Sequence, residues 1–180
     1  GLREETEKKD NLKRFLIVSA SERGDTTKKI IAAVEELGHK PTIIRADTAY
    51  IGEIDGDEMT IENIDKKGTD ITVNVKETIA FVRGSAMKTA GGRALVEGLD
   101  SSDTLVINSK KVFDLVGNKY ATHVLFEREN INTPRTALIT NESSIDRAHK
   151  KVGGKFPVIV KSLHGAEGIG VAKVDSQESF

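Results

Sequence analysis

A short, uninterrupted apolar run, FLIVSA at residues 15–20, is the feature that most restricts the fold of this chain. Runs of this kind are typical of parallel strands buried on both faces, and parallel strands need crossover connections, usually helices, to join them. The next segment, residues 26–37, repeats apolar positions at helical spacing and stops at Gly38, a residue that often ends helices. The chain is therefore expected to open with the β-α unit of an α/β fold.

The same alternation continues through the first half of the chain. Further elements are expected as strands over 42–44, 78–82 and 104–107, and as a helix over 86–99. Residues 58–75 alternate on both sides of DKKG at 65–68, which predicts a hairpin with a glycine-containing turn. We expect a flexible leader over 1–14 and a layered β-α-β domain over 15–109.

A second domain is expected over 110–180, because the strand pattern stops near residue 109. Asn118 can act as the N-cap of a helix, and Pro134 biases the residue before it towards an extended backbone. The expected elements are helices over 110–116, 119–128 and 141–152, and strands over 136–140 and 157–161.

A lysine precedes a glycine-rich loop in FPVIVKSLHGAEGIGV, where Lys161 stands before Gly165, Gly168 and Gly170 and the following residues look extended. A P-loop has its lysine after the glycines, and a dinucleotide-binding turn leads into a helix, so neither motif fits. A glycine hairpin can instead lay its N–H groups over a polyphosphate while the lysine supplies positive charge. The alternative is an ordinary hairpin whose glycines satisfy positive φ and whose lysine is solvated.

The amino-acid composition limits which partners and which kinds of site this chain can have. The chain has 27 basic and 28 acidic residues, so no net charge favours nucleic acid or an anionic membrane. It has no cysteine, which excludes disulfides, zinc thiolates and thiol nucleophiles, and its four histidines show no metal-ligand spacing. No apolar run reaches the length of a membrane span or of a signal peptide, and we expect a cytoplasmic protein.

Two motifs in the second half carry a resemblance to a known family. NKYATHVLFERENINTPRTALI and, after a short helix, GGKFPVIVKSLHGAEGIGV resemble the opening of the ATP-grasp fold, most closely the ribosomal-protein glutamate ligase (alpha-L-glutamate ligase) family. The matching positions are Asn118, Lys119, Ile131, Thr133, Pro134, Thr136, Pro157, Val160, Lys161, Gly165, Gly168, Ile169, Gly170 and Val171. The resemblance implies an α/β chain in which a Rossmann-like pre-ATP-grasp domain precedes the N-terminal part of an ATP-grasp domain.

The resemblance also implies an activity: ATP phosphorylates a carboxylate, an amine attacks the acyl phosphate, and an amide bond forms. The substrates would be glutamate or a similar amino acid and a peptide or protein terminus, and such ligases commonly form homo-oligomers. Lys161 and Lys119 would contact the ATP phosphates, and Gly165, Gly168 and Gly170 would form a moving lid.

The same resemblance implies Mg²⁺, held by Asp, Glu and Asn residues of the later half of the fold. These ligands are expected downstream of Phe180, and Asp175 with Glu178 resembles a capping box that opens a further helix. No metal ligand is therefore assigned within the chain, and by itself the chain is expected to be inactive. The alternative is a nucleotide-binding or structural module that does not catalyse.

Weaker candidates lie at the carboxyl ends of the first-half strands. Arg83 follows the strand over 78–82, where α/β sheets bind ligands, and in the similar ligases this region faces the acceptor substrate. Ser21 and Arg23 follow the first strand in the same way, although helix capping by Asp25 or Thr26 explains that loop equally well. For Arg83 the competing reading is a solvated or structural arginine.

Overall fold

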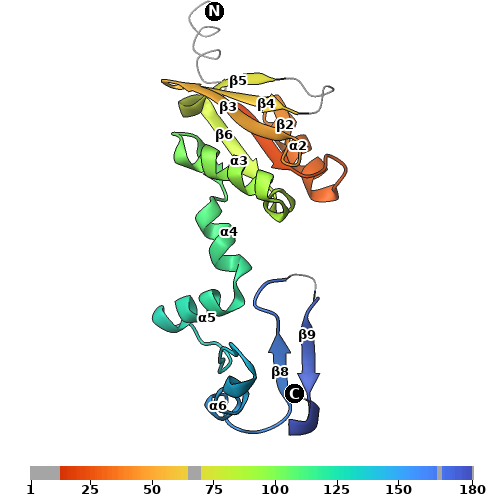
Figure 1. Ribbon diagram of the computed structural model, residues 1–180. Coiled ribbons are helices and arrows are strands. Elements are labelled where there is room, and N and C mark those ends of the chain that lie inside the picture. The colour runs from red at the N-terminus through yellow and green to blue at the C-terminus, as the bar shows by residue number, and fades with distance from the viewer. Residues whose placement is uncertain (1–12, 65–69, 166–167, 180) are drawn as a thin grey trace, which may run out of the picture. The chain divides into compact units, whose positions relative to one another are not determined.

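The computed structural model describes residues 13–64, 70–165 and 168–179, which form two compact units that divide between Phe113 and Asp114 (Figure 1). The expected turn at 65–68 and residues 1–12 of the expected leader lie outside the described residues. The domain boundary expected from the sequence falls at the start of helix α4 (Lys110–Gly117), and the division of the units falls within that helix.

A parallel sheet with strand order β2-β1-β6-β7 forms one layer of the first unit. Its strands are β1 (Arg14–Ser19), β2 (Pro41–Arg45), β6 (Thr78–Val82) and β7 (Leu105–Ile107). Helix α2 (Asp25–Glu36) joins β1 to β2, and α3 (Ala90–Ser101) lies between β6 and β7 in the chain. The two crossovers lead away from the β1–β6 pair in opposite directions, so the strand order reverses there. The predicted α/β fold is confirmed.

An antiparallel sheet of order β3-β4-β5 completes this unit, and the hairpin predicted over 58–75 is its β4 (Glu58–Asn63) and β5 (Ile71–Asn74). The sequence did not predict β3 (Ala49–Asp55). The register between β3 and β4 shifts between Ile51 and Ile54, and such an irregularity breaks the alternation by which a strand is recognised.

The core of the first unit fills the space between the two sheets and α3. Its fully buried members include Leu16 of β1, Met59 and Ile61 of β4, and Leu95 and Leu99 of α3. Burial of these aliphatic side chains supplies the main stabilisation of the unit.

Helix α3 begins at Ala90, whereas the sequence predicted a helix from residue 86; residues 84–88 form a 3₁₀ turn instead. Thr89 sets this start, because its side chain accepts a hydrogen bond from Gly92 N at 3.0 Å. Gly92 is required there, since a Cβ would lie 1.9 Å from Ala86 O. The bond accepted by Thr89 and the tight packing at Gly92 therefore start α3 at Ala90 rather than at residue 86.

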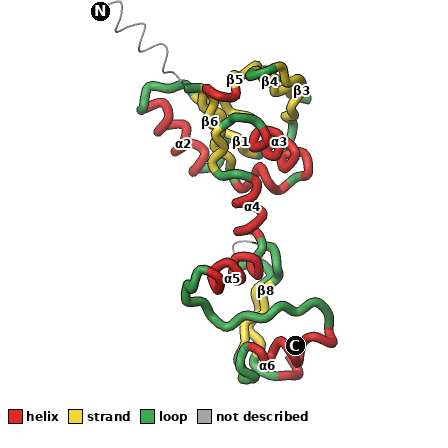
Figure 2. Tube along the Cα trace, turned by 90° about the vertical axis from the view of Figure 1, so that its left-hand side faces the viewer, coloured by secondary structure: helices red, strands yellow, loops and turns green. Residues whose placement is uncertain are grey.

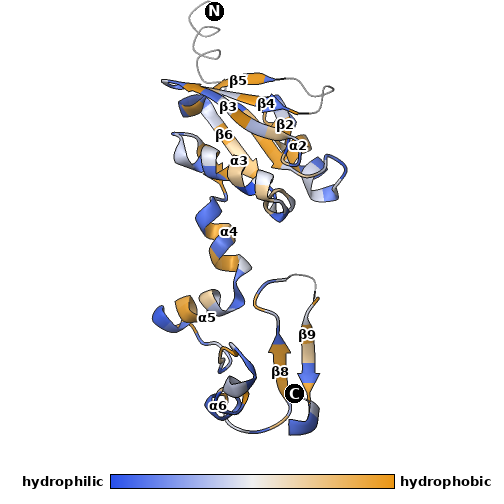
Figure 3. Ribbon diagram, in the orientation of Figure 1, coloured by the Kyte–Doolittle hydropathy of each residue, from blue (hydrophilic) through white to orange (hydrophobic). Residues whose placement is uncertain are grey.

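The second unit contains α5 (Lys119–Arg128), α6 (Ile145–Lys151) and an antiparallel pair, β8 (Val158–Lys161) and β9 (Val171–Val174). Short 3₁₀ turns cover Glu142–Ser144 and Gln177–Ser179. Most of β8 is apolar, as its colour in Figure 3 shows, and its Ile159 is 56% exposed.

The strand predicted over 136–140 is wrong: residues 131–140 run as a loop between α5 and the turn before α6 (Figure 2). A strand needs a neighbour for its backbone groups, and no described strand pairs with this segment. Its Leu138 and Ile139 are exposed. Among the described helices, none has the length and hydropathy needed to cross a membrane.

Candidate functional site

The lysine and glycines singled out in the sequence lie on one hairpin, which we call the lid hairpin (β8, the loop over 162–170 and β9). Lys161 ends β8 and pairs with Val171, the first residue of β9. Ser162 N then donates to Gly170 O at 2.7 Å, which continues the pairing by one step into the loop. The loop therefore leaves the strands directly after Lys161. The expected strand–loop–strand arrangement around this lysine is confirmed.

The three glycines of the loop all have positive φ, at 137° for Gly165, 77° for Gly168 and 71° for Gly170. Side chains are strained in this region of the backbone map. A Cβ on Gly170 would also lie 2.4 Å from Ser162 Oγ, whereas one on Gly168 would meet no atom within 4 Å. The loop conformation thus requires these glycines whether or not a phosphate binds.

Lys119 connects helix α5 to the lid hairpin. Asn118 caps the helix as predicted, because its Oδ1 accepts hydrogen bonds from two N–H groups of the first turn at 2.9 and 3.1 Å. Lys119 N donates to Leu163 O at 3.0 Å, and Lys119 Nζ donates to Gly165 O at 3.1 Å. The structure therefore brings one predicted lysine together with the predicted loop, 46 residues away in the chain.

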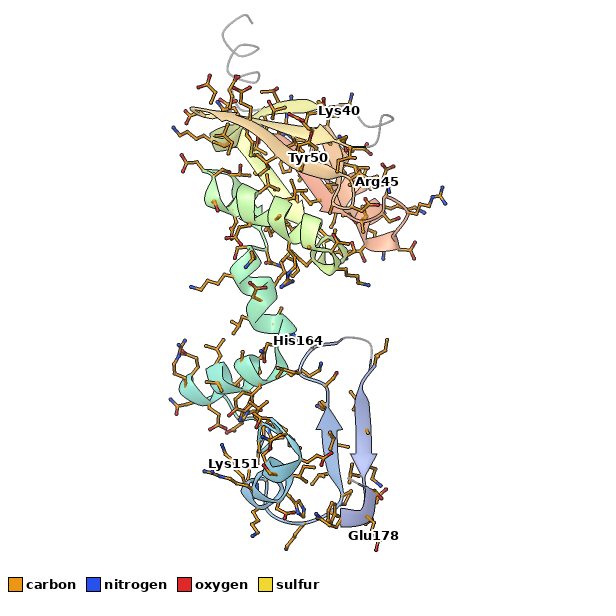
Figure 4. The ribbon with its side chains drawn as sticks, viewed as in Figure 1. Lys40, Arg45, Tyr50, Lys151, His164 and Glu178 are labelled. Atoms are coloured by element: carbon orange, nitrogen blue, oxygen red, sulfur yellow. The ribbon has the colours of Figure 1, made fainter. Side chains whose placement is uncertain are left out.

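A second contact between the loop and the start of α5 was not predicted. His164 Nδ1 lies 3.0 Å from Gly117 O, to which a protonated Nδ1 donates (Figure 4). Ser162 Oγ donates to His164 O at 2.6 Å and so fixes the turn that presents the ring. The His164 side chain is exposed. Its role in holding the loop depends on a contact that no local pattern reveals.

Lys161 differs from Lys119 in its contacts with the described residues. Within the described ranges, neither a hydrogen bond nor an ion pair engages its ammonium group, and the residue is exposed. An exposed ammonium beside main-chain N–H groups of a glycine loop suits a polyanionic ligand, since it supplies charge without breaking an existing pair.

The candidates of the first unit meet where its strand order reverses. Arg83 N donates to Val18 O at 2.8 Å, and Ser19 Oγ lies 3.2 Å from Ser85 Oγ, so the loops after β1 and β6 are joined. Ser85 was not predicted, because its contact with Ser19 spans 66 residues. Crevices at such reversals are where open α/β sheets bind ligands.

The loop after β1 is held by its own hydrogen bonds rather than by a helix cap. Ser21 Oγ accepts from Arg23 N at 3.1 Å. The capping alternative is wrong: Gly24 occupies the N-cap of α2, where no side chain makes a cap bond, so Asp25 and Thr26 already belong to the helix.

No metal-binding cluster of acidic and histidine side chains is found among the described residues. No group of three His, Asp or Glu side chains in them lies close enough to share a metal ion. Mg²⁺ needs carboxylate oxygens and water in a near-octahedral arrangement, and the lid hairpin presents lysines and main-chain groups instead. No step of the chemistry is assigned to a metal held by these residues.

Residues 116–179 match the protein-family model described as a RimK-like ATP-grasp domain. A "Probable alpha-L-glutamate ligase 2" of Pseudoalteromonas atlantica is 28% identical over 166 residues, which cover 92% of this chain and 52% of that protein. A "Probable alpha-L-glutamate ligase" of a Marinomonas species is 26% identical with the same coverage. The chain thus spans about half the length of the curated relatives it matches.

Solved structures share the fold. A RimK domain ATP-grasp protein from Sphaerobacter thermophilus superposes with a TM-score of 0.64 at 22% identity, covering 92% of this chain and 55% of that one. The ATP-grasp ligase PsnB, complexed with a minimal precursor, gives a TM-score of 0.65 at 14% identity, covering 93% and 58%. The ATP-grasp fold and the resemblance to alpha-L-glutamate ligases are confirmed.

Proposed function

We propose that this protein, whose residues 116–179 match a RimK-like ATP-grasp domain, is an ATP-dependent carboxylate–amine ligase that adds glutamate or a similar amino acid to a peptide or protein terminus. The hydrogen bond from Lys119 Nζ to Gly165 O carries the proposal, because it joins a lysine and a glycine loop that both suit a polyphosphate. Curated relatives named as alpha-L-glutamate ligases support the choice of glutamate.

The reaction proceeds in two steps. The carboxylate of one substrate attacks the γ-phosphorus of ATP, which releases ADP and leaves an acyl phosphate. The amine of the other substrate then attacks the acyl carbon, loses a proton and expels inorganic phosphate, so that an amide bond forms. Both steps involve dense negative charge, and catalysis consists mainly of neutralising it and aligning the reactants.

In this scheme the residues of the chain bind and orient the nucleotide. Lys161 contacts the α- and β-phosphates from the end of β8, and the N–H groups around Gly165, Gly168 and Gly170 cover them. Lys119 exchanges its hydrogen bond with Gly165 O for one with a phosphate oxygen. That exchange removes one of the bonds between the loop and the start of α5, while Lys119 N still donates to Leu163 O and His164 still contacts Gly117 O, so the loop stays at the nucleotide as a lid.

The acceptor is assigned to the edge of the parallel sheet at which β1 and β6 end. Arg83 follows β6 at that edge together with the half-buried Ser85, whereas the hydroxyl of the buried Ser19 is bonded to Ser21 O. An arginine and a hydroxyl suit a peptide carboxylate or carbonyl. Arg83 is proposed as a binding residue for the acceptor, not as a catalytic residue.

The test is glutamate-dependent release of ADP by the full-length protein and its Lys161→Ala variant. We expect the variant to lose at least about 90% of the activity, since a charge-assisted phosphate contact is worth roughly 1.5–3 kcal/mol. Lys155→Ala removes the same charge from an exposed position before β8 and should leave the rate unchanged. ADP release that is equal in all three proteins would refute the assignment.

A second candidate is a nucleotide-binding module without turnover. The observation that favours it is the lack of a metal-binding cluster in the described residues. Its signature is ATP binding, abolished by Lys161→Ala, with no ADP released under any combination of amino acid and peptide. Glutamate-dependent turnover excludes it.

A further inference from the structure

A hollow of about 290 Å³ lies in the second unit and is lined by none of the lid-hairpin residues. We call it the α5–α6 hollow. Its walls include Tyr120, His123 and Glu127 of α5, Arg135 and Thr136 of the following loop, and Lys151 at the end of α6. The volume is close to the lower limit of about 300 Å³ for small-molecule sites, which suits one side chain or a small ligand.

Arg135 and Lys151 are the two cationic residues that line this hollow. In the described part of the chain, neither Arg135 nor Lys151 has a hydrogen bond or ion pair through its charged group. The Arg135 guanidinium lies against Gly153, where a Cβ would sit 2.7 Å from Nη2. This places it beside the C-terminal end of α6, whose last turn carries Lys151 (Figure 4). The negative end of the helix dipole offsets part of their charge, and an anion there needs both cations to bind.

His123 contributes a largely buried ring to the same wall, since its side chain is only 13% exposed. Its Nε2 lies 4.0 Å from Glu127 Oε1, beyond hydrogen-bond distance, so the Glu127 carboxylate is not bonded to this ring.

The Glu127 carboxylate limits which anions can bind in the hollow. A carboxylate in the wall repels a small dianion such as phosphate, whereas a peptide can place one carboxylate on the cations and offer an N–H group to Glu127. Arg135 suits a carboxylate in particular, because its planar guanidinium can donate two parallel hydrogen bonds.

We propose that the α5–α6 hollow binds a carboxylate side chain of an acidic peptide, with Arg135 and Lys151 as its cationic partners. The inference rests on the proposed function, because each added glutamate makes the product more acidic. A cationic hollow outside the lid hairpin then favours binding of the acidic product.

The experiment measures binding of fluorescein-labelled tetraglutamate to the full-length protein by fluorescence anisotropy, with tetraglutamine as the uncharged control. We expect Arg135→Gln and Lys151→Gln each to weaken binding about tenfold or more, as for hydrogen bonds to charged groups. Arg147→Gln and Lys155→Gln remove the same charge from exposed residues that do not line the hollow, and these should change the affinity less than about twofold.

Three results would overturn the inference. Equal losses of peptide affinity in all four variants would mean non-specific charge attraction. Unchanged peptide affinity in Lys151→Gln would show that the hollow is not the binding site, since this exposed side chain can be changed without unfolding the unit. Full displacement of the peptide by inorganic phosphate at matched charge would identify a free-anion site instead.

ATP binding measured on the same samples separates this inference from the proposed function. Retained ATP binding without peptide binding refutes the hollow alone. Retained peptide binding without ATP binding refutes the ligase assignment.

Discussion

Gly170→Ala provides a quantitative test of the lid-hairpin geometry. Gly170 has φ of 71°, and an added Cβ would lie 2.4 Å from Ser162 Oγ and 2.9 Å from Ser162 Cβ. The left-handed backbone alone costs an alanine roughly 1–2 kcal/mol. The clash adds to this cost, because rotating Ser162 Oγ away breaks its hydrogen bond to His164 O and still leaves Ser162 Cβ too close.

Gly168→Ala is the matched control. Its φ of 77° imposes the same backbone cost, but its Cβ would have open space around it. A cost of roughly 1–2 kcal/mol corresponds to a factor of about 5–30 in the equilibrium between closed and open hairpin. Gly170→Ala should shift this equilibrium towards the open hairpin by more than that factor. In the double variant Ser162→Gly with Gly170→Ala, the shift should fall back towards that of Gly168→Ala.

The assay is native-state hydrogen exchange of the main-chain amides of β8 and β9, whose protection reports the opening of the hairpin. Gly168→Ala should reduce protection about 5–30-fold, and Gly170→Ala should reduce it further. Equal protection in the two single variants would refute the close approach of Ser162 to residue 170. Failure of Ser162→Gly to rescue would point to another source of strain.

Three further predictions follow from other parts of the chain. Asn118→Ala should destabilise the start of α5 by about 0.5–2 kcal/mol, seen as faster amide exchange in its first turn, whereas Asn118→Ser should largely restore it. The hydrogen bond to Glu62 raises the pKa of Tyr50 above 10.0, so its stabilisation is complete below that pH and is lost as the pH rises through the folded value. A phenolate absorbance titration in a Tyr120→Phe background should therefore move to lower pH in Glu62→Gln, and an unmoved midpoint would contradict the contact. Leu16→Ala, at a fully buried position, should cost about 2–5 kcal/mol in denaturant unfolding of the first unit, and a cost below 1 kcal/mol would contradict the described core.

Local periodicity accounts for what could be predicted of the fold. FLIVSA predicted β1 because a strand buried on both faces has a continuous apolar run. Asn118 predicted the start of α5 because a helix cap acts within one turn. The strand expected over 136–140 failed because pairing depends on a distant partner, which extended residues cannot specify. Strand β3 was missed because its register shift disrupts the alternation.

The same distinction applies to the candidate site. Lys161 and the loop glycines stood out because their spacing along one hairpin is fixed by local geometry. His164 and Ser85 did not, because their contacts join residues 47 and 66 positions apart. The α5–α6 hollow could not be predicted from the sequence for the same reason, since two helices and a loop that share no motif form its walls.

The most direct test of the central claim is the affinity of the full-length protein for ATP, measured by titration calorimetry alongside Lys161→Ala and Lys119→Ala. If the lid hairpin and the start of α5 cradle the phosphates, each variant should bind ATP about tenfold or more weakly, and Lys155→Ala should bind it normally. ATP affinity that is the same in all four proteins would contradict the account.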